Sequence, residues 1–123
     1  MITVAVILVI IAGLAHVAFF VAEALLFSRP AVHQAFGAHD AETARIQASV
    51  FRNIGFYNLF LGVGAIVGAV LLASSGQVTL ALFASLFMVG AALVLIATSR
   101  AMWRGALVQG LIPAVAATLL LVS

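Results

Sequence analysis

Residues 2–27 read ITVAVILVIIAGLAHVAFFVAEALLF, and this stretch decides the fold class of the chain. The hydrocarbon core of a bilayer is about 30 Å thick and needs roughly 20 apolar residues per helical crossing. The stretch exceeds that length and carries only two ionisable side chains, His16 and Glu23. It also lacks the positive flank of a signal peptide, so we expect an uncleaved membrane-spanning helix.

The composition of the whole chain also favours a membrane protein. Of its 123 residues 67% are hydrophobic and 7% are charged, whereas a soluble domain has about 25% charged residues. The mean hydropathy is +1.38. A soluble domain is therefore excluded, and the length allows four spans joined by short loops. The five basic residues form no run, which sets nucleic acid aside as a partner.

Four apolar runs predict one all-α membrane domain over residues 1–123. The expected spans are about 2–27, 45–73, 78–99 and 103–122. Between the first two, Pro30 is suited to begin a short interfacial helix that Gly37 ends, and Asp40 is suited to cap the next helix. Short loops make neighbouring helices antiparallel, so the predicted fold is a four-transmembrane-helix bundle with one short interfacial helix.

The arginines predict the orientation of this bundle. Arg29 and Arg45 flank the loop after the first span, and Arg100 and Arg104 flank the loop after the third. Both termini and the remaining loop carry no lysine or arginine. Because positive loops face the cytoplasm, we expect a multi-pass protein of the bacterial inner (plasma) membrane with both termini extracytoplasmic.

Polar side chains inside the spans are the candidates for function, because they are costly in hydrocarbon. They are His16 and Glu23 in the first span, Arg52, Asn53, Tyr57 and Asn58 in the second, and Gln109 in the fourth. At about 1.5 Å per residue, Glu23, Arg52 and Asn53 share one layer, and His16, Tyr57 and Asn58 share a deeper one. Pro113 leaves the carbonyl of Gln109 without its helical donor. These groups predict a polar pocket in the inner half of the bundle.

His16 and Glu23 are the candidate acid–base pair of this pocket. Seven residues separate them, which puts them on one helix face with Cα atoms roughly 10 Å apart. Another side chain or a bound molecule must therefore lie between them. The binding candidates are Arg52, Asn53, Tyr57, Asn58 and Gln109.

Structural roles stay open for the same residues. Glu23 and Arg52 are equally suited to a buried ion pair that fixes the register of two helices, which places Glu23 within reach of Arg52 or Asn53. His16 bonded to Tyr57 or Asn58 is equally suited to hold helices together.

Two other groups of residues predict packing or solvation and no chemistry. Gly64 with Gly68, and Ala65 with Ala69, have the small-residue spacing of packed membrane helices. The group His33, His39, Asp40 and Glu42 has no strong ligand spacing, so we expect a solvated loop there and no metal site.

The motifs of the first half resemble a known family. They are His16-x-x-Phe19-Phe20-x-x-Glu23-x-x-x-Phe27, then Pro30, Phe36-Gly37 and Asn53-x-Gly55-x-Tyr57-Asn58. This pattern is similar to the domain-of-unknown-function family 1304, small four-helix membrane proteins of bacteria. The resemblance implies a membrane location and a four-helix bundle, and it implies no activity.

Three functions of different classes fit these residues. The favoured one is a small intramembrane enzyme or binding protein, whose pocket accepts a lipophilic small molecule from the bilayer and acts on it by acid–base chemistry. A haem with His16 as axial ligand is a variant, so the cofactor stays undetermined. The alternatives are a proton-coupled transporter acting as a homo-oligomer, and a structural or accessory membrane subunit. The gathering of polar groups in one half favours the pocket.

Overall fold

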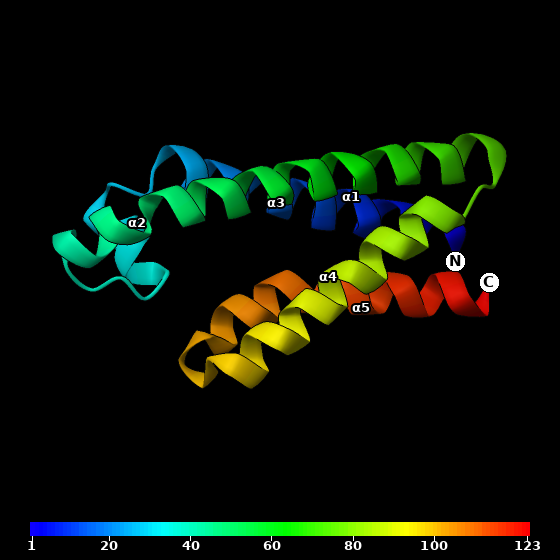
Figure 1. The fold of residues 1–123 in the computed structure, drawn as a ribbon. Helices are drawn as coiled ribbons and strands as arrows, with labels where there is room; N and C mark the ends of the chain where they lie inside the picture. Colours follow the sequence, from blue (N-terminus) through cyan, green and yellow to red (C-terminus); the bar gives the residue numbers. More distant parts are fainter.

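The computed structural model describes all residues, 1–123, and it is all-α (Figure 1). Its elements are α1 (Ile2–Phe20), the π-helical turn η1 (Val21–Leu25), α2 (Pro30–Ala35), α3 (Ala41–Ser75), α4 (Thr79–Thr98), the 3-10 turn η2 (Arg100–Met102) and α5 (Trp103–Val122). Four helical segments, α1 with η1, α3, α4, and η2 with α5, are long and apolar enough to cross a membrane. The predicted fold class is therefore confirmed.

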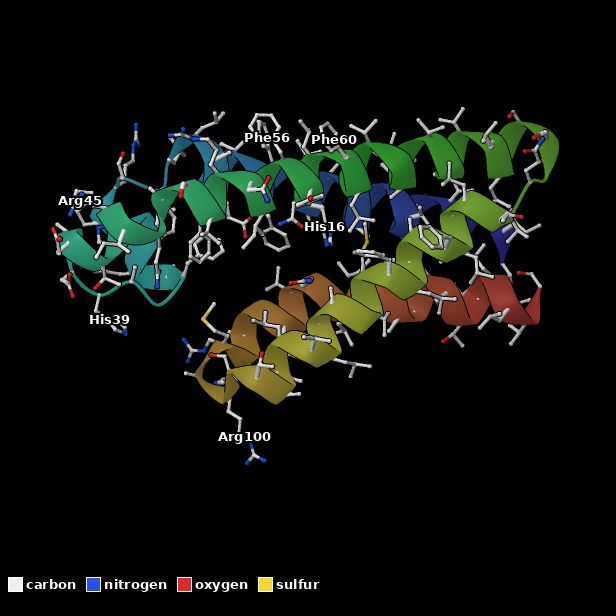
Figure 2. All side chains as sticks on the ribbon, in the orientation of Figure 1. His16, His39, Arg45, Phe56, Phe60 and Arg100 are labelled. Carbon is white, nitrogen blue, oxygen red and sulfur yellow. The ribbon has the colours of Figure 1, made fainter.

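The four long helices form two pairs. Helix α1 packs along α3, and α4 packs along α5 (Figure 1). Both termini lie at one end of the molecule, while α2 and the turn between α4 and α5 lie at the other. Arg45 and Arg100 mark this second end (Figure 2), which we call the arginine end. The pairs diverge toward it.

Most of the hydrophobic core lies near the termini. It consists of Ala5, Val9, Ala12, Ala65, Ala69, Leu72, Ala81, Ala84, Met88, Ala116 and Leu120. A second, smaller cluster of Phe27, Ala38 and Ala44 lies at the arginine end, where the rings of Phe27 and Phe51 stack with centroids 4.4 Å apart. The core is therefore continuous near the termini and interrupted toward the arginine end.

Glycine allows α1 and α3 to approach closely. A Cβ atom on Gly62 would lie 2.6 Å from the carbonyl oxygen of Gly13, and one on Gly13 would lie 2.8 Å from that of Gly62. Of the predicted small-residue spacings, Gly68 contacts Ala81 of α4, whereas Gly64 has nothing within 4 Å of an added Cβ. The small residues thus pack helices within the bundle, except at Gly64.

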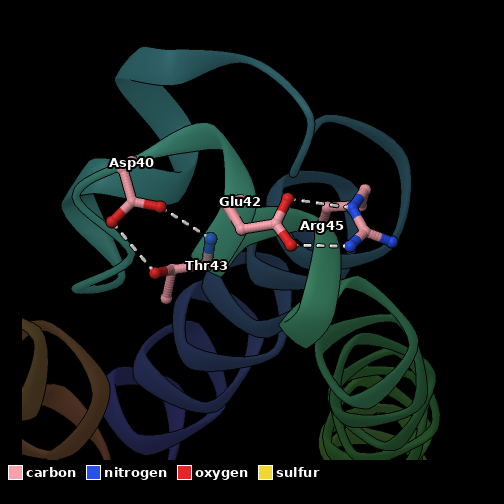
Figure 3. Close-up of polar contacts among 4 residues, drawn as sticks. All are labelled: Asp40, Glu42, Thr43 and Arg45. Carbon is pink, nitrogen blue, oxygen red and sulfur yellow. Dashed lines mark hydrogen bonds and ion pairs between the residues drawn. The ribbon is translucent and has the colours of Figure 1, made fainter.

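The connection between α1 and α3 forms as its turn residues predict. Pro30 begins α2, and Gly37 adopts a left-handed φ of 90°. Asp40 caps α3: its carboxylate accepts hydrogen bonds from the Thr43 backbone N–H at 2.7 Å and from the Thr43 hydroxyl at 3.0 Å (Figure 3). These bonds lower the pKa of Asp40, chiefly through the backbone donor.

One expectation for this connection is wrong. His33 does not lie in a solvated loop: it belongs to α2 and is 3% exposed. Its Nδ1–H donates to the Ala38 carbonyl oxygen at 2.6 Å, and its ring lies beside Phe27. The short α2 helix folds back over Phe27, and this buries the imidazole.

Helix α3 is longer than a membrane requires. Its 35 residues extend about 52 Å at 1.5 Å per residue, against about 30 Å of hydrocarbon. It begins at Ala41 and ends at Ser75, outside both ends of the span predicted over 45–73. A crossing needs about 20 residues, so α3 exceeds the thickness of the hydrocarbon layer by about 15 residues.

Candidate intramembrane site

Glu23 lies in the π-helical turn that ends the first span. The backbone N–H of Leu26 donates to the carbonyl oxygen of Val21 at 3.0 Å, five residues earlier. Single π-helical turns inside helices are rare and occur frequently at functional sites. Residues 21–25 read VAEAL and contain neither proline nor glycine. Sequence reasoning therefore gave no signal for this turn.

Asn58 is the partner of Glu23. Glu23 is 6% exposed, and its Oε2 accepts a hydrogen bond from Asn58 Nδ2 at 2.7 Å. Gly55 permits this contact, because a Cβ there would lie 3.0 Å from the backbone nitrogen of Ala24 and 3.2 Å from the Cβ of Glu23. The other oxygen, Oε1, has no hydrogen bond but is not enclosed by protein. It can accept one from a bound molecule.

The predicted pairing of Glu23 with Arg52 or Asn53 is wrong. The ion pair in the structure joins Arg45 to Glu42 at 2.7 Å (Figure 3), and Arg52 and Asn53 are exposed. Because α3 starts before the predicted span and overshoots the hydrocarbon, Glu23 lies beside Gly55 and Asn58. Arg52 is exposed on α3 and has no carboxylate oxygen within 4.0 Å.

His16 also has other partners than predicted. It is fully buried and points from α1 into the bundle (Figure 2). Its Nδ1 must donate, because the partner at 2.9 Å is the carbonyl oxygen of Ala12. Neither Tyr57 nor Asn58 bonds it. The Nε2 atom, left as an acceptor, is buried without any partner.

Phe19 lies between His16 and Glu23 on their common helix face, three residues from one and four from the other. Its ring meets the imidazole edge to face, with centroids 5.2 Å apart. The space predicted between His16 and Glu23 therefore contains the ring of Phe19.

A cleft of about 690 Å³ opens between the two helix pairs toward the arginine end. Four of the predicted site residues line it: Glu23, Tyr57, Asn58 and Gln109. Its walls are mostly hydrophobic and include Phe19, Phe51 and Phe87. The cleft therefore combines one carboxyl group and five neutral polar side chains, those above and Thr98 and Ser99, with an apolar surface.

The remaining predicted residues lie outside this cleft. Arg52 shares a smaller cavity with Glu23, whereas His16 and Asn53 line neither of these two cavities. Apart from Gln109, sequence reasoning missed the far wall, which α4, η2 and α5 supply through residues such as Ala91, Thr98 and Gly105. Ala91 and Gly105 have no polar side chain, and the Thr98 hydroxyl donates to the Val94 carbonyl oxygen of its own helix at 2.8 Å. These residues line the cleft because the helix pairs diverge.

Comparison with known proteins places the chain in a family. No curated protein and no solved structure matches it. The family described as protein of unknown function (DUF1304) matches residues 10–121, nearly the whole chain and including α3, α4 and the Glu23 turn. The resemblance predicted from the motifs is confirmed, and the chain belongs to the DUF1304 family.

Proposed function

We propose that this membrane protein binds a lipophilic small molecule in the cleft between its helix pairs, with Glu23 as the polar anchor. The observation that carries the proposal is a mainly apolar cavity of about 690 Å³ with a carboxyl group in its wall. Cavities of about 300–1,000 Å³ with apolar walls and few polar groups are typical ligand sites. The cleft lies between membrane-spanning helices, so the ligand enters sideways from the bilayer.

The chemistry of the wall selects the ligand's polar group. Asn58 occupies Oε2 of Glu23 and leaves Oε1 as an acceptor. A ligand with a hydroxyl or amino group donates to that oxygen, whereas an ionised fatty acid is repelled by it. Glu23 is then the group that accepts the hydrogen bond of the ligand's hydroxyl or ammonium group. His16 does not line the cleft and receives no catalytic role in this proposal.

The orientation follows from the arginines. The arginine end, onto which the cleft opens, faces the cytoplasm, and both termini face outward, in accordance with the positive-inside rule. The ligand is therefore drawn from the inner leaflet.

Three probes of equal chain length test the proposal: dodecylamine, dodecanol and dodecanoic acid. A ligand that binds only the folded protein raises its melting temperature. We expect stabilisation by the amine and the alcohol and none by the acid. The amine should stabilise more than the alcohol, because its ammonium forms a charge-assisted hydrogen bond with the carboxylate. Glu23→Gln should remove the advantage of the amine over the alcohol, because the carboxylate charge is lost.

Two substitutions on α4 serve as a matched pair for the cleft. Ala91 lines it, and Ala97, on the same helix, is exposed and does not. We expect Ala91→Trp to abolish stabilisation by the amine and the alcohol, and Ala97→Trp to preserve it. Gly105→Leu is a second filling variant, since an added Cβ would meet only side-chain atoms at 3.7 Å and 3.9 Å. Equal responses to all three probes, or unchanged binding in both filling variants, would contradict the proposal.

A further inference from the structure

Glu23 also borders a second cavity, on the side away from the cleft's far wall. This cavity has a volume of about 320 Å³ and lies between η1, α2 and the first turns of α3. Its polar and charged lining residues are Glu23, Ser28, His33, Arg45 and Arg52. It is thus more highly charged than the cleft, and the proposed cleft ligand does not account for it.

Arg52 and Glu23, the charged groups of this cavity without an ionic partner, do not form an ion pair with each other. Arg45 is already bound to Glu42 through two hydrogen bonds of 2.7 Å and 3.2 Å. Arg52 has no carboxylate oxygen within 4.0 Å and forms no hydrogen bond to the protein. Glu23 retains Oε1 without a hydrogen bond. One free cation and one free carboxylate oxygen therefore line a single cavity.

The depth of the cavity matches the headgroup region. The hydrocarbon segment of α3, counted as about 20 residues back from Ser75, ends near Phe56. Arg52 lies one turn beyond that point, where guanidinium groups meet lipid phosphates. Glu23 lies beside Gly55, at the boundary of the hydrocarbon. Arg52 and Gly55 are three residues apart, so the cation and the carboxylate lie within about one helical turn of each other in depth, as the phosphate and ammonium of one headgroup do.

We propose that this cavity binds a phosphoethanolamine headgroup, with the phosphate on Arg52 and the ammonium on Oε1 of Glu23. An arginine fork matches phosphate oxygens, and a primary ammonium offers N–H donors to a carboxylate. A choline headgroup has the same charges but no N–H donor. A glycerol headgroup offers hydroxyl donors but no cation for Glu23, so its hydrogen bond to the carboxylate is the weaker one. The site discriminates between headgroups and goes beyond the cleft function, since it uses Arg52 and a separate volume. Both ligands use Oε1 of Glu23, so the headgroup and the cleft ligand exclude each other.

Calorimetric titration with dihexanoyl phospholipids tests the site, using the purified full-length protein in detergent. We expect the ethanolamine lipid to bind about tenfold more tightly than the choline or glycerol lipid, the difference expected for one charge-assisted hydrogen bond. Free phosphoethanolamine should compete with it; failure to compete while the lipid still binds would assign the affinity to the acyl chains and overturn headgroup recognition.

Arginine variants supply the matched comparison. Arg52→Gln should weaken the binding of the ethanolamine lipid about tenfold or more. Arg100→Gln should leave it unchanged, because Arg100 is exposed at the same end and lines neither cavity. Equal affinities for the three lipids, or equal effects of the two variants, would overturn the proposal. Ala91→Trp separates the two sites: it should leave the lipid affinity intact even if the cleft ligand proves wrong.

Discussion

Glu23 depends on a single side chain, Asn58, for the hydrogen bond that accompanies its burial. A buried acceptor that loses its partner costs about 1–3 kcal/mol. We expect Asn58→Leu to lower the free energy of unfolding by that amount. Glu23→Gln should have a smaller effect, because its amide oxygen accepts the same hydrogen bond and exposed Arg52 does not depend on it. Reversible unfolding in detergent measures both, and a larger loss in Glu23→Gln would contradict this assignment.

His16 carries a buried acceptor, Nε2, without a donor. Replacing an unsatisfied polar group by an apolar one of similar shape removes a desolvation penalty. We expect His16→Phe to raise the free energy of unfolding by about 1 kcal/mol, measured in the same detergent. A loss of stability in this variant would show that Nε2 has a partner in the working protein.

The polar residues of the site were predictable as a set, but their pairing was not. Residue types in apolar runs identified Glu23, Asn58, Tyr57 and Gln109, which all line the cleft. The pairing depends on how far α3 extends past the end of the first span. The partner of Glu23 is Asn58, five residues beyond the predicted Asn53 and six beyond Arg52. Arg52 illustrates this: it was predicted inside the bundle and lies at its surface.

Helix α3 offers a matched pair of glycines two residues apart. A Cβ on Gly62 would lie 2.6 Å from the carbonyl oxygen of Gly13, whereas one on Gly64 would meet nothing within 4 Å. We expect Gly62→Ala to cost about 1–3 kcal/mol by forcing α1 and α3 apart. Gly64→Ala should cost nothing, since alanine favours helix. Thermal unfolding compares the two, and equal melting temperatures would contradict the close approach of α1 and α3.

The cap of α3 predicts a dependence of stability on pH. Because its pKa is lowered from 3.8 in the folded protein, Asp40 contributes stability that is fully present above its ordinary pKa. That contribution is lost as the pH falls through the lowered value. Asp40→Asn retains a cap that does not titrate, and Asp40→Ala removes it.

The measurement for this cap is the melting temperature of the three proteins between pH 6 and pH 2. We expect the difference between wild type and Asp40→Asn to change below about pH 4 and to be constant above it. A constant difference at every pH would show that the Asp40 carboxylate does not cap α3.

Among the elements, the helices were predictable and the π-helical turn was not. Apolar length predicted four spans. Pro30 and Gly37 correctly marked the start and the end of α2, and Asp40 marked the start of α3. The turn at Val21–Leu25 has ordinary helix-forming residues. It is the site where η1 lies against Gly55 of α3, a contact that residue propensities do not encode.

The whole molecule has an asymmetric distribution of core residues. Small buried residues hold all four helices together near the termini. Toward the arginine end the smaller cluster around Phe27 contains no residue of α4 or α5, and the cleft lies between the pairs there. The sequence shows both groups, but which helix faces which is determined only in the assembled bundle. The cleft is a consequence of this asymmetry, and it places the Glu23 turn opposite α4 and α5.

The central claim is that this cleft holds a lipophilic molecule, and native mass spectrometry of protein released from lipid nanodiscs tests it most directly. The matched forms are wild type, Ala97→Trp and Ala91→Trp. We predict one bound species of a single mass on the wild type and on Ala97→Trp, and its loss from Ala91→Trp at unchanged helical content. The same species at equal occupancy on all three proteins, or no bound species on any of them, would contradict the claim.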